Sequence, residues 1–158
     1  MNSIQLEELF LLDSEIRKCY MGIYPIDEIP DVKNGKLVVV NLDPSYRPGS
    51  HWIVLYRRND AYMEYFDSMG RKPKIDILTY LFAKNYKCVY NAKRIQDYNT
   101  NTCGLFCLFY AYYACRSCSF ENIINCFTDN LKINEALVKK TNLYLQSKRN
   151  LYMTSTEV

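Results

Sequence analysis

The first twenty residues place apolar side chains at the spacing of an amphipathic helix. Side chains that recur every three or four positions share one face of a helix, and residues 3–20 follow this spacing. Gly22 and Pro25 end the pattern, because glycine and proline disfavour the continuation of a helix. We therefore predict a helix over residues 3–20, with an apolar face made of Ile4, Leu6, Leu9, Leu12, Ile16 and Cys19.

Short runs rich in β-branched and aromatic residues follow at 36–42, 51–57 and 62–67. Runs of this kind, flanked by turn-forming residues, are typical of buried strands. A short linker that contains Asn59 and Asp60 separates the second run from the third, and both residues favour tight turns. We therefore predict that 51–57 and 62–67 form an antiparallel hairpin.

The segment 103–116 is apolar on almost every side, which is typical of a helix buried by its neighbours. A further strand is predicted over 87–95, and further helices over 75–83, 119–128 and 133–147. The sum is an α+β fold, an antiparallel sheet of about four strands packed around the central helix that begins at Cys103. We predict a single domain over 1–148 and a loose C-terminal tail over 149–158.

The composition fits one compact domain, with 158 residues of which 49% are hydrophobic and 15% aromatic. A chain of this length can bury a substantial core without a second domain. No run reaches the roughly 18 apolar residues of a membrane span, so no membrane association is expected. The seven cysteines are odd in number and follow no hydrophobic leader, so we expect reduced thiols in an intracellular protein, most simply a monomer.

Charge is unevenly distributed along the chain. Residues 1–31 hold seven acidic and two basic residues, a net charge of −5, whereas residues 32–103 hold twelve basic and six acidic residues, a net charge of +6. A basic segment of this kind can contact DNA or an acidic protein surface. An ordinary solvated surface explains the same pattern and is the simpler interpretation.

Cys103 stands where the polar stretch NTNT changes into an apolar run. The first N–H groups of a helix lack intrahelical partners, and the helix dipole adds partial positive charge there. Both effects favour a thiolate over a thiol. Cys103 is therefore a candidate nucleophile, and Gly104 beside it leaves room for an approaching backbone.

His51 and Asp67 are the candidate partners of this thiol. His51, the only histidine, begins one strand of the predicted hairpin and Asp67 ends the other, so the two side chains can meet at its open end. A lone strand histidine is more often structural, but a thiol, an imidazole and a carboxylate together supply nucleophile, base and orienter. Gln96, seven residues before Cys103, offers a side-chain amide as a donor to an oxyanion.

These residues resemble the adenovirus-protease (adenain) family and the related SUMO-type ubiquitin-like proteases. His51, Asp67, Gln96 and Cys103 occur in the family's order, and the similar stretch covers about 36 to 117. His51, Asp67 and Cys103 lie within the strings GSHW, YFDSMG and TCGLFC. YFDSMG is closer to the SUMO proteases, which use aspartate where adenovirus enzymes usually use glutamate. The gap from Gln96 to Cys103, the glycine-bearing loop before His51 and the small size are closer to the viral enzymes and their relatives in large DNA transposons.

The resemblance implies an adenain-like thiol endopeptidase that cuts after glycine in small-residue motifs of viral or virus-like capsid or core precursors, in the virion or the host nucleus. It implies no cofactor for the chemistry and suggests stimulation by DNA or a short peptide. A cysteine that links such a peptide would lie on the strand before Gln96; Cys88 lies in that region at a different spacing, and a small core residue is its simpler interpretation. The alternatives are an isopeptidase that removes a ubiquitin-like modifier, and a catalytically silent module that binds DNA or protein.

Three further features have structural explanations as well. Trp52 directly follows His51 and is predicted to pack at the edge of the active site, although a core tryptophan would be equally ordinary. Cys107 lies one helical turn beyond Cys103 and is predicted to be core. Cys115 and Cys118 form a C-x-x-C pair, but with one histidine and no second pair we predict no metal site.

Overall fold

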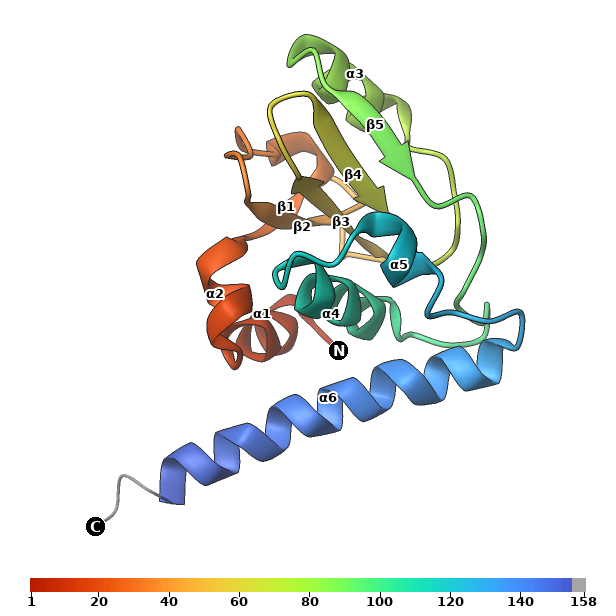
Figure 1. Cartoon of the computed structure of the whole chain (residues 1–158). Helices are drawn as coiled ribbons and strands as arrows, with labels where there is room; N and C mark the ends of the chain where they lie inside the picture. The colour runs from red at the N-terminus through yellow and green to blue at the C-terminus, as the bar shows by residue number, and fades with distance from the viewer. Residues whose placement is uncertain (155–158) are drawn as a thin grey trace.

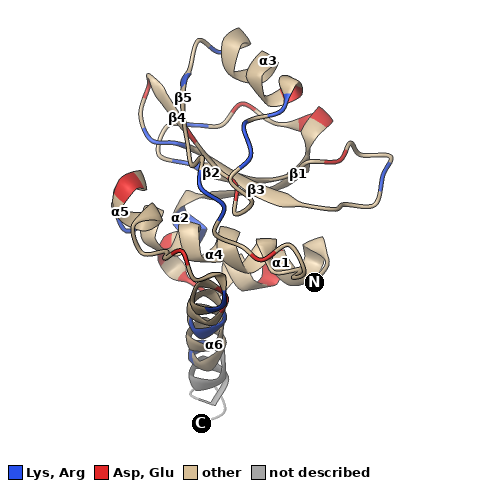
Figure 2. Cartoon of the chain, turned by 90° about the vertical axis from the view of Figure 1, so that its right-hand side faces the viewer, with Lys and Arg blue, Asp and Glu red and all other residues tan. Residues whose placement is uncertain are grey.

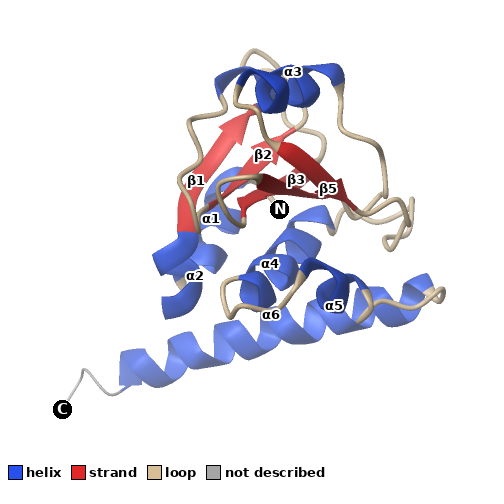
Figure 3. Cartoon of the chain, turned by 45° about the horizontal axis from the view of Figure 1, so that its top comes forward, coloured by secondary structure: helices blue, strands red, loops and turns tan. Residues whose placement is uncertain are grey.

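The protein folds around a mixed five-stranded sheet with helices on both faces (Figure 1 and Figure 3). The computed structural model describes the backbone of residues 1–154 and the side chains of residues 1–148. In the order of the sheet, the strands are β1 (Tyr20–Pro25), β2 (Leu37–Asn41), β3 (Trp52–Arg57), β4 (Tyr62–Phe66) and β5 (Lys87–Tyr90). The strands β2, β3 and β4 pair antiparallel, whereas β1 joins β2 and β5 joins β4 in parallel.

The helices divide between the two faces of this sheet. They are α1 (Ser3–Leu11), α2 (Ser14–Cys19), α3 (Ile75–Ala83), α4 (Cys103–Ala114), α5 (Phe120–Ile124) and α6 (Leu131–Thr154), with a short 3-10 turn at Ile26–Glu28. α3 covers one face, and α1, α2 and α4 lie on the other, with α6 running along the outer side of α4 (Figure 1). No helix within residues 1–154 is long and apolar enough to cross a membrane.

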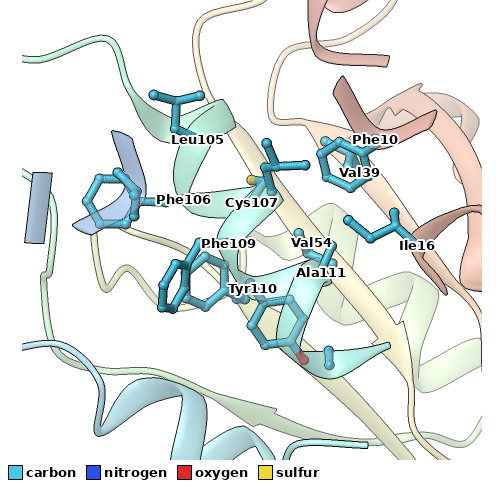
Figure 4. Close-up of a cluster of buried hydrophobic side chains, with 14 of the residues drawn as sticks. Phe10, Ile16, Val39, Val54, Leu105, Phe106, Cys107, Phe109, Tyr110 and Ala111 are labelled. Carbon is cyan, nitrogen blue, oxygen red and sulfur yellow. The ribbon is translucent and has the colours of Figure 1, made fainter. Parts of the chain in front are cut away.

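The two faces bury alternate residues of the central strands β2, β3 and β4, because successive side chains in a strand point in opposite directions. Val38 and Ile53 belong to the cluster beneath α3, whereas Val39 and Val54 belong to the larger cluster around α4. Figure 4 shows Val39, Val54 and Phe10 grouped around the side chains of α4. Ten of the twelve residues of α4 are buried, which confirms the predicted central helix.

The single helix predicted over residues 3–20 is wrong. The helix ends at Leu11, and a second helix, α2, begins at Ser14. Asp13 caps α2, since its Oδ1 accepts hydrogen bonds from the N–H groups of Glu15 and Ile16 at 3.0 and 3.1 Å. The other carboxylate oxygen of Asp13 lies 2.7 Å from a guanidinium nitrogen of Arg116 at the end of α4. The last residue of the predicted helix instead begins β1, which adds a strand that the helical pattern concealed.

The α+β class and the hairpin are confirmed, and α3 has the predicted bounds. The sheet differs from the prediction in having five strands and two parallel pairings. The pairing of β5 with β4 is parallel because α3 is a crossover connection, which returns the chain to the edge at which β4 began. The predicted strand 87–95 ends at Tyr90, where the side chain of Asn91 replaces a ladder partner and accepts a hydrogen bond from the N–H of Asp67 at 2.9 Å.

The C-terminal helices also differ in length from the prediction. α5 is shorter than the predicted 119–128, because the chain leaves the helix at Asn125. α6 begins before residue 133 and continues to Thr154, so the helix runs six residues into the segment 149–158 that we predicted as a tail. Residues 155–158 lie outside the described residues.

Candidate active site

His51 and Asp67 meet at the open end of the β3–β4 hairpin. His51 immediately precedes β3 and Asp67 immediately follows β4, and the antiparallel register pairs Val54 with Phe66 near this end. Nε2 of His51 lies 2.6 Å from Oδ1 of Asp67, in a position where the histidine is 8% exposed and the aspartate is fully buried. The structure therefore places the imidazole and the carboxylate in contact, as the hairpin predicts.

The Asp67 carboxylate is fixed by its own turn. Oδ1 accepts a second hydrogen bond, from the N–H of Met69 at 2.9 Å, and the N–H of Gly70 donates to the Asp67 carbonyl at 2.8 Å. Within residues 1–148, Oδ2 of Asp67 is buried without a hydrogen-bond partner. The contacts of the carboxylate thus converge on the oxygen that faces His51, which favours a fixed ring orientation.

Cys103 is the first residue of α4 and is 6% exposed. Burial alone raises the pKa of its thiol, but hydrogen bonds with His51 and with the backbone amides of Trp52 and Gly104, together with the charge on His51, bring the pKa below its ordinary value. The amide of Gly104 belongs to the first turn of α4, and the amide of Trp52 belongs to the first residue of β3. The predicted position of Cys103 at the N-terminus of a helix therefore stabilises the thiolate together with the imidazole.

The imidazole responds in the opposite sense. Burial alone lowers the pKa of His51, but the hydrogen bonds and charges of Asp67 and Cys103 outweigh it and raise the pKa to about 9. Because Nε2 is occupied by Asp67, Nδ1 is the ring nitrogen left for the sulfur. A raised imidazole pKa beside a lowered thiol pKa is the signature of a thiolate–imidazolium pair, in which each charge stabilises the other.

A cleft of about 480 Å³ opens in front of this pair. His51, Cys103 and Gln96 line it together, so the structure brings three of the predicted residues to one surface. Trp52 lies in the same wall, and Arg71 adds a positive charge. A bound peptide in this cleft would have the sulfur, the imidazole and a side-chain amide within its reach.

The chain is similar to viral proteases. It is 27% identical over 145 residues to a protein named Protease from Bovine adenovirus 7, covering 78% of this chain and 72% of the relative. The crystal structure of the ASFV pS273R protease superposes on this chain with a TM-score of 0.59 at 16% sequence identity, and the match covers 87% of this chain and 65% of that one. A selenomethionine crystal structure of the same protease superposes with a TM-score of 0.43 at 24% identity, and the match covers 65% of this chain and 43% of that one. No protein-family model matches the chain.

The predicted resemblance to adenovirus-type proteases is confirmed. The resemblance to the adenovirus relative extends over most of this chain, beyond the roughly half that the motifs covered. The solved structure with a TM-score of 0.59 establishes a likeness of fold alone, and this chain spans about two thirds of its length.

Gln96 is buried, and both ends of its side-chain amide are held. Oε1 accepts a hydrogen bond from the Ser68 hydroxyl at 2.6 Å. Nε2 donates to the carbonyl of Thr100 at 3.0 Å and approaches the Thr100 hydroxyl at 3.3 Å. A carbonyl can only accept, so these contacts assign the amide nitrogen to the Thr100 side of the group. Motif reasoning missed both partners, although Ser68 lies within YFDSMG.

The two residues predicted at the edge of the site lie in different places. Trp52 lines the cleft and packs partly against the main core, as predicted for the edge of the site. Gly104 lies instead beneath α1, where an added Cβ would lie 3.1 Å from Leu6 and 3.2 Å from Met1. The close approach at Gly104 is thus made by side chains of the N-terminal segment, and an approaching backbone is not what the structure places there.

The remaining cysteines differ from Cys103 in environment. Cys107 is a buried core residue, as predicted; its thiol donates to the Trp52 carbonyl at 3.4 Å, and burial raises its pKa well above the ordinary value. Cys88 is half-buried on β5, packs against the cluster under α3, and burial raises its pKa to about 11.

All seven cysteines are free, and residues 1–148 hold no group of three or more potential metal ligands, so Cys115 and Cys118 have no third ligand within that part of the chain.

Proposed function

We propose that this chain is a thiol endopeptidase that cleaves after glycine in small-residue motifs of viral or virus-like capsid or core precursors. The observation that carries the proposal is the His51–Asp67 contact of 2.6 Å beside a thiol whose pKa is lowered by the same histidine. The similarity to an adenovirus protease supports the viral setting. The preference for glycine rests on the resemblance of the motifs around His51 and Cys103.

The proposed reaction begins with the thiolate of Cys103 and the imidazolium of His51. The sulfur attacks the carbonyl carbon of the scissile bond, and the π electrons move to oxygen to give a tetrahedral oxyanion. As the carbon–nitrogen bond breaks, His51 gives its proton to the leaving amine, and an acyl-enzyme remains on Cys103. His51 then takes a proton from water, the resulting hydroxide displaces the sulfur, and the thiolate and the protonated ring are restored.

Two donors are proposed for the oxyanion. One is the side-chain amide of Gln96, and the other is the N–H of Cys103, the first of α4, which donates to no other group within residues 1–148. Donors of this kind act in the transition state, because they pair with charge that the ground-state carbonyl lacks. Asp67 holds the ring of His51 in one tautomer throughout.

The decisive experiment is hydrolysis of a panel of glycine-containing peptides by the wild-type chain and by Cys103→Ala. We expect cleavage after glycine by the wild type and none by the variant, with both proteins equally folded by circular dichroism. Cleavage by Cys103→Ala at the wild-type rate would overturn the assignment of the nucleophile. Cys126→Ala, which changes an exposed cysteine on the short loop after α5, serves as the matched control and should cleave normally.

A second candidate is an isopeptidase that removes a ubiquitin-like modifier. It is favoured by Asp67 itself and by the string YFDSMG, which resemble the SUMO-type proteases. Incubation with a panel of modifier conjugates, beside the Gly-Gly peptides, separates the two activities, since a processing protease leaves the conjugates intact.

Stimulation by DNA or by a short peptide is proposed as well, without a cofactor for the chemistry. Lys and Arg residues lie on the loops beside β4 and β5 and along α6, interspersed with acidic residues (Figure 2). Added DNA should raise the cleavage rate in a salt-dependent manner if this surface binds phosphates. Salt-sensitive DNA binding by a chain that cleaves no peptide would instead favour the silent binding module. Action in the virion or the host nucleus, by a monomer, completes the proposal.

A further inference from the structure

A buried carboxylate on α6 anchors the loop that carries Gln96 and leads to Cys103. Glu135 is 6% exposed, and its two oxygens accept hydrogen bonds from different threonines, Oε1 from Thr100 and Oε2 from Thr102, each at 2.7 Å. The N–H of Asp97 approaches Oε1 at 3.4 Å. One carboxylate thus contacts both the beginning and the end of the segment that joins Gln96 to Cys103.

The Thr100 contact transmits this anchoring to the Gln96 amide. The Thr100 carbonyl accepts a hydrogen bond from Nε2 of Gln96 at 3.0 Å, and the Thr100 hydroxyl lies 2.7 Å from Oε1 of Glu135 and 2.9 Å from the Asp97 carbonyl. The second N–H of the amide makes only a 3.3 Å approach to the Thr100 hydroxyl. At the other end of the amide, Oε1 is held by Ser68, which is 1% exposed and follows Asp67 directly. The orientation of the amide is therefore set from both ends, by residues that have no contact with the thiol.

The Thr102 contact has a different effect. Thr102 occupies the N-cap position of α4, where threonine usually accepts a hydrogen bond from the helix backbone, but its side chain makes no such bond. Its hydroxyl donates to Glu135 instead. The N–H of Cys103, the first of α4, therefore has no capping partner among residues 1–148.

We infer that Ser68 and Glu135 are positioning residues of the oxyanion site, which act through Gln96 and through the open start of α4. The inference rests on the proposed hydrolytic function, and it concerns stabilisation of the oxyanion and not formation of the thiolate. Iodoacetamide alkylates a thiolate by displacement at carbon without an oxyanion, whereas peptide hydrolysis forms one. The two reactions of the same sulfur therefore separate the two roles.

The test compares Ser68→Ala, Glu135→Ala and Lys139→Ala, the last an exposed residue one turn further along α6. We expect kcat to fall about tenfold in Ser68→Ala and by more in Glu135→Ala, with KM and the alkylation rate of Cys103 near their wild-type values, because part of the contribution of an oxyanion donor is lost. Lys139→Ala should match the wild type in all three measurements. Parallel losses of kcat and alkylation rate in Ser68→Ala would overturn the inference, since they would indicate general damage to the site.

A double-mutant cycle decides whether Ser68 acts through Gln96. If it does, Ser68→Ala should lower kcat about tenfold in the wild type but leave the residual kcat of Gln96→Ala unchanged, because the amide that it positions is absent. Equal losses in both backgrounds would contradict the inference. Ser68→Ala removes one hydroxyl, so this cycle remains informative even if Glu135→Ala fails to fold.

A measurement without turnover keeps this inference separate from the proposed function. The side-chain amide of Gln96 gives a pair of ¹H–¹⁵N resonances that Gln96→Ala identifies by their loss. In Ser68→Ala these resonances should shift and exchange faster with solvent, and unchanged resonances would overturn the positioning role. If the wild-type chain cleaves neither peptides nor modifier conjugates, the proposed function fails, while this result still decides whether Ser68 holds the amide.

Discussion

The side chains of His51 and Asp67 are joined by a 2.6 Å contact although sixteen residues separate them in the chain. The contact forms because the β3–β4 hairpin returns the chain to its own starting point. Asp67 holds only one tautomer of the ring, with the proton on Nε2 and Nδ1 directed to the sulfur. Most of the expected behaviour of the site follows from this relationship.

Replacement of Asp67 by asparagine should lower kcat by about 10³- to 10⁴-fold, because an amide can hold the ring in the wrong tautomer. The protein should remain folded, since asparagine has nearly the same shape. Peptide hydrolysis measures the effect. Asp60→Asn, in the turn at the far end of the same hairpin, is the control and should keep wild-type activity. A fall of less than tenfold in Asp67→Asn would argue against an orienting role.

Alkylation by iodoacetamide at neutral pH should select Cys103 over the other six cysteines, by at least about tenfold. Burial raises the pKa of the Cys103 thiol, but its hydrogen bonds and the charge on His51 outweigh burial and lower that pKa. In Cys88, Cys107 and Cys126, burial raises the pKa. Peptide mapping by mass spectrometry measures each rate. Cys126 is the strictest comparison because it is exposed and still should react more slowly. His51→Ala should abolish the preference, and its survival there would show that the thiolate does not depend on the imidazole.

The cleavage rate should fall as the pH rises through about 9. His51 in the folded protein has a raised pKa, so the imidazolium persists to that pH and is lost above it. The thiolate of Cys103 has a lowered pKa, so the pair is lost on the acid side only when the pH falls below that value. The active form therefore occupies the window between the two. A profile of kcat/KM against pH checks both limbs, and a rate that keeps rising through pH 10 would contradict the raised pKa.

Substitution of Gly70 by alanine should destabilise the fold. Gly70 has φ +65°, and an added Cβ would lie 2.5 Å from the backbone of Lys93 and Arg94. We expect a loss of about 2 kcal/mol or more, because the clash adds to the backbone strain. Gly35 has a similar φ of +71° with no atom within 4 Å of an added Cβ, so Gly35→Ala should cost only about 1 kcal/mol. Chemical denaturation of both variants gives the comparison, and equal losses would remove the clash from the explanation.

The sequence predicted the parts of the site whose geometry is local. A hairpin has only one way to join His51 and Asp67, and an apolar run after a polar stretch indicates where the helix of Cys103 begins. The anchoring of the loop between Gln96 and Cys103 was beyond such reasoning, because Glu135 comes from a helix packed against α4 and nothing in the spacing of residues fixes which face it presents. Tertiary packing alone brings Thr100 and Glu135 together.

The same contrast applies to the fold. The hydrophobic pattern identified β2, β3, β4 and α3, whose side chains alternate or recur on a clear face. It missed β1, because the apolar spacing of the first two helices continued into a strand of only partly buried residues. It also missed the parallel pairings. The direction of β5 depends on the path of the chain through α3, and the residues of the strand have the same pattern in either direction.

The turn of the β3–β4 hairpin offers a place to extend the protein. Asn59 closes this turn by accepting hydrogen bonds from the N–H groups of Ala61 and Tyr62, and the turn lies a full strand length, about 17 Å, from His51 and Asp67. Residues inserted between Asn59 and Asp60 would replace this turn by a longer loop in solvent, while the register of the strands still fixes the opposite end. A fluorescent label or an affinity tag placed there should therefore leave the alkylation of Cys103 unchanged and allow the working enzyme to be captured without use of either terminus.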